Sequence, residues 1–157
     1  LKAAKKAQEK IDTPFTPAIS LVVALNESLK LIKEEGLENI FKRHRRLAEA
    51  TRQAMRALDL ELFAPTAASD AVTAVKVPPG IDGEKLVKTM RDKFGVTIAG
   101  GQAELKGNVF RIAHMGYITQ QDIIVAISTL ELALAEVGYK FELGAGIRAT
   151  EEILKRG

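Results

Sequence analysis

The sequence predicts an α+β fold: a small, mainly antiparallel sheet of about four strands, with helices packed on one face and two long helices before it. Two observations predict this class. Apolar residues recur every three or four positions over two long N-terminal stretches, and short β-rich segments then alternate with further helical patterns. The 157 residues are 46% hydrophobic and 27% charged, which is typical of one globular domain.

The N-terminal part is predicted to be helical with two breaks. Residues 1–10 are helix formers, and the two prolines of residues 11–17 favour an extended loop. A helix is expected from residue 18 up to Gly36, and a second long helix over residues 37–58. The first of these has one apolar stripe that we expect to be buried, formed by Ile19, Val22, Val23, Leu29 and Ile32.

The rest of the chain alternates strands and helices. Strands are predicted over four β-rich segments: 60–63, 71–77, 96–98 and 109–114. Asp82 is expected to cap a helix that ends at Gly95, and Thr119 with Asp122 resembles a capping box that starts another. A last short helix is expected over residues 147–155. The sheet has one face without helices, so we expect another domain or subunit to cover it.

The amino-acid composition excludes several kinds of site and disfavours some classes of protein. There is no cysteine, so disulfides, cysteine zinc sites and thiol chemistry are excluded. Two histidines leave little for a histidine-rich metal site, and we expect no metal ligand. The longest apolar stretch, 19–25, is too short to span a membrane, and we expect a cytoplasmic protein. The net charge is +3, and 5% of residues are aromatic. The basic run 42–46 is expected to be a solvated helix face, so we expect no nucleic-acid partner.

Arg111 is the most informative candidate residue. On a strand its side chain shares a face with Val109 and Ala113, while Phe110 and Ile112 point into the helix-covered core. Its planar guanidinium matches a carboxylate, which makes it a candidate anion clamp. Spacing alone leaves a second interpretation open, and it is the commoner one: an arginine that reaches from the sheet to a nearby glutamate.

Two further features have a functional and a plain interpretation. Gly100 and Gly101 could bring backbone N–H groups to a ligand, although such a pair is more often only a turn. Thr13 and Thr16 precede a helix N-terminus that favours phosphate, although capping of that helix by Thr16 is the commoner role.

The two histidines have plain interpretations. His44 continues an apolar stripe and is expected to be half-buried or at an interface. His114 ends a strand without an obvious partner.

Several segments together carry a resemblance to a known family. TPFTPAISL, the following two-helix stretch, AVTAVKVPPGID and VTIAGGQAELKGNVFRIAHMG resemble, in order and spacing, the C-terminal half of class V, fold-type I pyridoxal-phosphate aminotransferases. The chain is most similar to the alanine-glyoxylate and serine-pyruvate type, whose members are also labelled soluble hydrogenase small subunit. The resemblance covers nearly the whole chain.

The resemblance implies roles for these residues. Arg111 in FRIAHMG matches the arginine that binds the substrate carboxylate, and Gly100 and Gly101 match a loop near the substrate. Thr13 or Thr16 matches the loop that crosses a homodimer interface and contacts the phosphate of pyridoxal 5'-phosphate; loop length leaves the choice between them open. Residues 1–17 would then end the large domain, and residues 18–157 would form the small domain.

The resemblance also implies what this chain lacks. The lysine that binds the cofactor lies upstream in the family, so we expect this chain to be an inactive fragment whose partners are the large domain, a second subunit, and amino-acid and 2-oxo-acid substrates. The opening at Leu1 inside a helical pattern agrees with that expectation. The rival interpretation is a free-standing α+β module that binds a carboxylate metabolite without catalysis.

Overall fold

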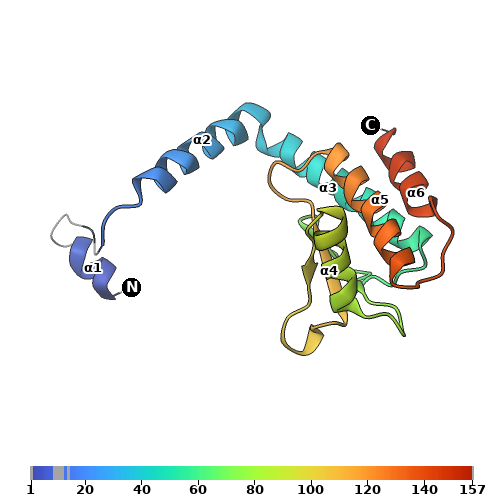
Figure 1. The fold of residues 1–157 in the computed structure, drawn as a ribbon. Coiled ribbons are helices and arrows are strands. Elements are labelled where there is room, and N and C mark those ends of the chain that lie inside the picture. The colour runs from blue at the N-terminus through green and yellow to red at the C-terminus, as the bar shows by residue number, and fades with distance from the viewer. Residues whose placement is uncertain (1, 9–12, 14, 157) are drawn as a thin grey trace. The chain divides into compact units, whose positions relative to one another are not determined.

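The computed structural model describes residues 2–8, 13 and 15–156 (Figure 1). It forms two compact units, and the first ends at Ile40 while the second begins at Phe41. We call them the N-terminal unit and the sheet unit and describe each by itself. The helices are α1 Lys2–Gln8, α2 Ile19–Glu35, α3 Leu37–Ala57, α4 Gly83–Phe94, α5 Gln120–Glu136 and α6 Ala145–Leu154. The strands are β1 Val72–Lys76, β2 Ala99–Gly100 and β3 Val109–Ala113, and a 3-10 turn, η1, spans Ala103–Leu105.

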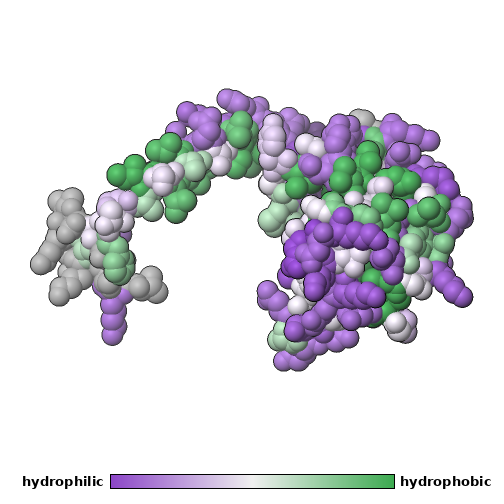
Figure 2. All heavy atoms as spheres, in the orientation of Figure 1, coloured by the Kyte–Doolittle hydropathy of each residue, from purple (hydrophilic) through white to green (hydrophobic). Residues whose placement is uncertain are grey.

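Helix α2 confirms the predicted helix but not its predicted burial. Gly36 ends it with a φ of 80°, and its N–H donates to the carbonyl of Ile32. None of its residues is buried, and its large apolar side chains are 38–69% exposed. Figure 2 shows this apolar surface along α2. The expected burial of this apolar stripe is therefore wrong, because its side chains are exposed.

The start of α2 also differs from the plain expectation for Thr16. Ala18 is the residue before the helix, and no side chain caps it. Thr16 is exposed and does not act as the cap. The predicted helix over 1–10 is described only over α1, and residues 9–12 and 14 of the predicted loop lie outside the described residues.

The sheet unit holds an antiparallel sheet in the order β1-β3-β2. The sheet therefore has three strands rather than the four we predicted. Residues 60–63 form only an isolated bridge, Leu62 with Val75, next to β1. Residues 96–98 are not a strand; β2 follows them and is two residues long. Both segments are too short to make a full ladder with their neighbours.

Helices cover one face of this sheet, as predicted. Phe110 and Ile112 of β3 and Val75 of β1 are buried there in one core with Met55 of α3 and Ile127 of α5. The predicted caps are confirmed: Asp82 accepts hydrogen bonds from the first turn of α4, and Thr119 and Asp122 form a capping box at α5. Helices α5 and α6 pack together next to this core (Figure 1).

Helix α6 begins at Ala145, two residues before the predicted start. Its N-cap, Gly144, has no side chain to cap it. Glu131 of α5, which is 3% exposed, supplies the carboxylate instead: it accepts hydrogen bonds from the N–H groups of Gly144 at 2.6 Å and Ile147 at 3.1 Å. A buried carboxylate is favourable at this position because the N-terminus of a helix is positively polarised. Among the described residues, no helix is long and apolar enough to cross a membrane.

Candidate functional site

Arg111 lies at the centre of the sheet face that the helices leave open. It is on the middle strand β3, opposite Ala74 of β1 on one side and Ala99 of β2 on the other. Its neighbours along the strand, Phe110 and Ile112, are 0% and 3% exposed on the opposite face. The predicted orientation of Arg111 is therefore confirmed, and small side chains flank it so that its guanidinium is accessible.

The Arg111 guanidinium is held by one backbone carbonyl. Nε and Nη2 both donate to the carbonyl oxygen of Gly100, at 3.2 Å and 2.8 Å. Among the residues that the structure describes, Arg111 has no carboxylate partner, so the alternative of an arginine paired to a glutamate is not observed. A carbonyl fixes the direction of the group without cancelling its charge. The side chain is thus positioned and still able to bind an anion.

A groove of about 860 Å³ runs past Arg111 between β2, β3 and the start of α5. Its walls are mostly apolar, and they include Val72, Ala113, Met115 and Val125. An apolar wall lowers the local dielectric and strengthens the attraction between a guanidinium and a carboxylate.

Asp122 also lines this groove, but its carboxylate is already engaged by the capping box. Asp122 accepts hydrogen bonds from the backbone N–H of Thr119 at 2.8 Å and from its hydroxyl at 2.7 Å, and these bonds lower the pKa of that carboxyl. Arg111 is therefore the only cation of the groove among the described residues, and the groove suits a small carboxylate.

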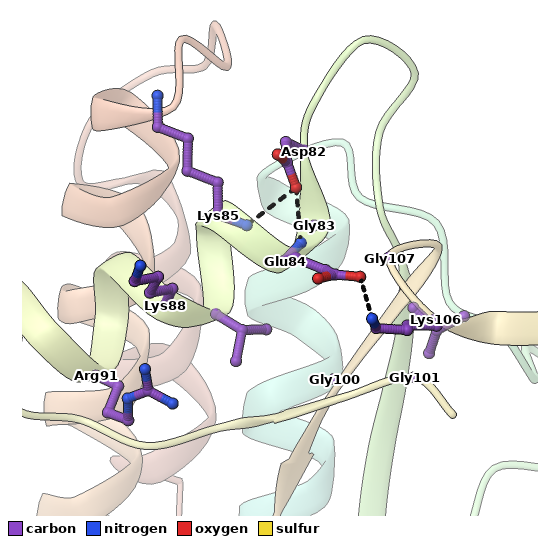
Figure 3. A pocket seen from close by; sticks show the side chains of 12 residues that line it. Asp82, Gly83, Glu84, Lys85, Lys88, Arg91, Gly100, Gly101, Lys106 and Gly107 are labelled. Atoms are coloured by element: carbon purple, nitrogen blue, oxygen red, sulfur yellow. Dashed lines mark hydrogen bonds and ion pairs between the residues drawn. The ribbon is translucent and has the colours of Figure 1, made fainter. Parts of the chain in front are cut away.

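Gly100 and Gly101 line a different cavity from Arg111, on the side of α4 (Figure 3). They reach the arginine only through the Gly100 carbonyl. Gly101 has a clear steric reason to be glycine, because a Cβ there would lie 1.9 Å from the carbonyl oxygen of Leu105 in η1. A Cβ on Gly100 would meet only Val87, at 3.9 Å. Gly101 thus permits the tight turn that places the Gly100 carbonyl against Arg111.

Thr13 and Thr16 belong to the N-terminal unit, whereas Arg111, Gly100 and Gly101 belong to the sheet unit. Both threonines are exposed, and the Thr13 hydroxyl donates to the carbonyl of Phe15 at 2.7 Å. The Arg111 groove contains no lysine that could hold pyridoxal phosphate. The described residues alone therefore do not fit the whole cofactor; the Arg111 groove fits a small carboxylate.

The basic run 42–46 differs from the predicted solvated face. His44 is half-buried, as expected, but Arg43 and Arg46 are half-buried too. The Arg43 Nη1 donates to the carbonyls of Gly116 at 3.0 Å and Ile118 at 2.9 Å, in the loop after β3. The prediction assigned the whole run to a solvated helix face. Its spacing carried the missed signal, since positions three and four apart share one helix face.

His114, predicted to lack a partner, has two. Its Nδ1 lies 3.1 Å from the carbonyl oxygen of Asp70, and its Nε2 lies 2.9 Å from the hydroxyl oxygen of Thr73. A carbonyl only accepts, so Nδ1 carries the proton and Nε2 accepts from Thr73. Burial lowers the pKa of His114 below its ordinary value of 6.5, although the bond to the Asp70 carbonyl opposes this shift. A neutral His114 therefore ties the end of β3 to β1.

Comparisons with known proteins identify the family of this chain. The model of the aminotransferase class-V family matches residues 5–125. The small subunit of soluble hydrogenase from Synechococcus is 47% identical over 152 residues, which are 96% of this chain and 39% of that protein. L-aspartate–glyoxylate aminotransferase from Paracoccus denitrificans is 38% identical over 88% of this chain and 36% of its own length.

A solved structure carries the same fold. Ureidoglycine–glyoxylate aminotransferase from Bacillus subtilis superposes with a TM-score of 0.87 at 32% sequence identity, over 91% of this chain and 38% of that one. The chain thus spans about two fifths of the length of the proteins it matches. Sequence and structure together show that this chain belongs to the aminotransferase class-V family.

Proposed function

We propose that this chain is the C-terminal part of a pyridoxal-phosphate aminotransferase. In this proposal residues 1–17 end the large domain and cross a homodimer interface, and residues 18–157 form the small domain. The whole protein moves an amino group between a small amino acid of the alanine or serine type and a 2-oxo acid such as glyoxylate or pyruvate. The names of the relatives support glyoxylate as an acceptor, because several of them are glyoxylate aminotransferases.

One observation carries the role that we assign to this chain. Arg111 projects from the open sheet face into a groove with apolar walls, is held by the Gly100 carbonyl, and has no carboxylate partner in the described part of the chain. Amino-acid and 2-oxo-acid substrates share a carboxylate next to the reacting carbon. A planar guanidinium in this position binds that carboxylate and fixes the orientation of the reacting carbon.

Other parts of the proposal concern the remaining polypeptide. The amine that holds pyridoxal phosphate and most of the phosphate site come from the large domain, so this chain alone is inactive. Thr13 or Thr16 completes the phosphate site of the second subunit. The exposed apolar surface of α2 supports a place next to further protein, since such a surface is unfavourable in water. We assign the protein to the cytoplasm.

The test is steady-state kinetics of the full polypeptide that contains this chain, with Arg111→Ala and Arg111→Lys. We expect Arg111→Ala to lower kcat/KM for the amino acid and the 2-oxo acid roughly 10- to 100-fold, the effect of losing a charged hydrogen-bonded contact of about 1.5–3 kcal/mol. The kcat/KM of Arg111→Lys should lie between those of the wild type and Arg111→Ala, because an ammonium keeps the charge and loses the planar fork.

Lys76→Gln is the matched control. Lys76 is a cation on β1, on the same open face as Arg111, and it is already paired with Glu61. Its removal should leave kcat/KM near the wild-type value. Wild-type kcat/KM in Arg111→Ala, or an equal loss in both variants, would contradict the proposed role of Arg111.

A second candidate function rests on the sheet unit alone. This unit contains the entire Arg111 groove and its own core, which would suit a free-standing module that binds a carboxylate metabolite without catalysis. Reading the coding sequence upstream of Leu1 separates the two functions. A lysine-bearing domain in the same reading frame supports the aminotransferase, and a start codon directly before Leu1 supports the module.

A further inference from the structure

A second groove of the sheet unit lies away from Arg111, between α3, the start of α5 and the end of α6. Its volume is about 540 Å³. Three basic residues of α3 line it, together with Leu47, Thr119, Gln120, Gln121 and Leu154. The basic residues are Lys42, Arg43 and Arg46, and no acidic residue lines this groove among those described. We call it the α3–α5 groove.

Arg46 is the residue of this groove for which a bound anion would be most favourable. Its Nε is buried and has no hydrogen-bond partner, and the described residues offer Arg46 neither an acceptor nor an ion pair. A guanidinium is always charged and has five N–H donors. Leaving a buried donor of a charged group without an acceptor is unfavourable. An anion in the groove would relieve that cost after a small rotation of the guanidinium.

The start of α5 presents further donors to the same space. Thr119 is the N-cap, and its hydroxyl already accepts from the N–H of Asp122. The N–H groups of Gln120 and Gln121 are in the first turn and have no acceptor within the helix. They point away from the helix end, where the helix dipole favours negative charge. The groove therefore combines two backbone donors with the side chains of α3.

Arg43 shows that this part of α3 is fixed against the neighbouring loop. Its Nη1 donates to the carbonyls of Gly116 and Ile118, which hold the guanidinium in place. Lys42 is exposed at the rim, and none of the hydrogen bonds or ion pairs of the described residues involves it. One cation held by hydrogen bonds and one exposed cation thus line the groove beside Arg46.

The cavity beside α4 provides a contrast, because two carboxylates line it, those of Asp82 and Glu84 (Figure 3). Asp82 accepts from the N–H groups of Glu84 and Lys85, both at 3.0 Å, so the start of α4 is capped. Glu84 in turn pairs with Lys106 at 3.1 Å. That cavity also has basic residues and a helix N-terminus, but it has two carboxylates of its own. Among the described residues no carboxylate lines the α3–α5 groove, and the Asp122 carboxylate of the α5 capping box lines the Arg111 groove instead.

We propose that the α3–α5 groove binds the phosphate group of a small molecule. A phosphate has enough oxygens to accept from the Arg46 guanidinium and from the first-turn N–H groups of α5 at the same time, while Lys42 closes over it. The aliphatic side chains of Leu47 and Leu154 line the rest of the groove and leave space for an organic part of the ligand. This site is separate from the Arg111 groove and does not depend on the proposed aminotransferase function.

The test is a titration of the ¹⁵N-labelled 157-residue chain with inorganic phosphate at constant ionic strength, followed by NMR. The expected result is a saturable shift of the Gln120 and Gln121 amide signals. Arg46→Gln should weaken the apparent affinity about tenfold or more, because it removes a charge-assisted hydrogen bond. Arg46→Lys should lose less, because it keeps the charge, and it also serves if Arg46→Gln fails to fold.

Arg45→Gln is the matched control, since it removes the same charge from the adjacent position. The Arg45 side chain is 75% exposed and contacts Asp70 instead of the groove. The Arg45→Gln variant should bind phosphate with the same apparent affinity as the wild type. Absence of saturation at tens of millimolar phosphate, equal weakening in Arg45→Gln and Arg46→Gln, or the same shifts with acetate at equal ionic strength would each overturn the proposal.

Discussion

Helix α2 and the helices of the sheet unit have similar hydrophobic patterns, but their apolar side chains differ in burial. Both have apolar residues three and four positions apart. In the sheet unit those residues belong to one core, in which Ile127 and Leu130 of α5 are 0% exposed. In α2 the apolar residues remain exposed, with Leu21 at 69% and Val22 at 63%. The pattern therefore predicts that a helix face is to be covered, but it does not say which polypeptide covers it.

The largest difference between the two regions should appear when each loses a large apolar side chain. Phe110→Ala should lower the free energy of unfolding by about 3–5 kcal/mol, because it removes buried surface and leaves a cavity. Leu21→Ala should change it by no more than about 0.5 kcal/mol, as for other exposed positions. Denaturant unfolding followed by circular dichroism measures both. Similar losses in the two variants would mean that α2 is buried in this chain.

The next effect concerns the cap that α5 supplies to α6. Glu131→Gln should lower the free energy of unfolding by about 1.5–3 kcal/mol, since the buried carboxylate accepts from Gly144 and Ile147 and an amide accepts less well. Glu142→Gln is the control: Glu142 is 75% exposed and pairs with Arg148, so its loss should cost about 0–1 kcal/mol. Equal losses in the two variants would contradict the role of Glu131 as the cap of α6.

The turn after β2 provides a comparison of adjacent glycines. Gly101→Ala places a Cβ against the Leu105 carbonyl and should destabilise by about 1–3 kcal/mol through overpacking. In Gly100→Ala the new Cβ makes only an ordinary van der Waals contact, so this variant should lower the free energy of unfolding less than Gly101→Ala. In the full polypeptide, Gly101→Ala should also raise KM for the 2-oxo acid, because it displaces the carbonyl that holds Arg111. Thermal unfolding and KM together check this; a wild-type KM in Gly101→Ala would contradict the positioning role.

The smallest effect is a pH dependence from His114. Its pKa is lowered in the folded state, so the unfolded chain binds more protons once the pH falls below 6.5. The contribution of His114 to the free energy of unfolding is therefore fully present above pH 6.5, and it decreases as the pH falls toward the pKa of His114 in the folded state. Arg52, Asp70 and His44 are the charged or titratable neighbours. The free energy of unfolding should fall less between about pH 7.5 and about pH 5.5 in His114→Gln than in the wild type. Equal decreases would contradict this account.

Local signals predicted the parts of the fold that depend on neighbouring residues. Alternation along residues 109–113 placed Arg111 on the open face, and the capping residues Asp82 and Thr119 marked the starts of α4 and α5. The segment 60–63 was predicted as a strand because it alternates. It forms only one bridge, at Leu62, because its pairing depends on β1 rather than on its own composition.

Contacts between distant residues could not be predicted from the sequence. His114 pairs with Thr73, 41 residues away, and the Arg111 guanidinium binds the Gly100 carbonyl, 11 residues away across the sheet. Arg43 reaches the loop after β3 over 73 residues. Each of these contacts requires the register of the sheet or the packing of α3, which no local pattern contains. The resemblance to class V aminotransferases supplied the carboxylate role of Arg111, and the strand pattern supplied only its direction.

The most direct measurement is a crystal structure of the full polypeptide with a bound amino acid or 2-oxo acid. We expect both carboxylate oxygens to lie about 2.7–2.9 Å from nitrogen atoms of the Arg111 guanidinium, with the Gly100 carbonyl still accepting from its other edge. A substrate whose carboxylate lies elsewhere, while Arg111 contacts only Gly100, would contradict the proposed function of this sheet face.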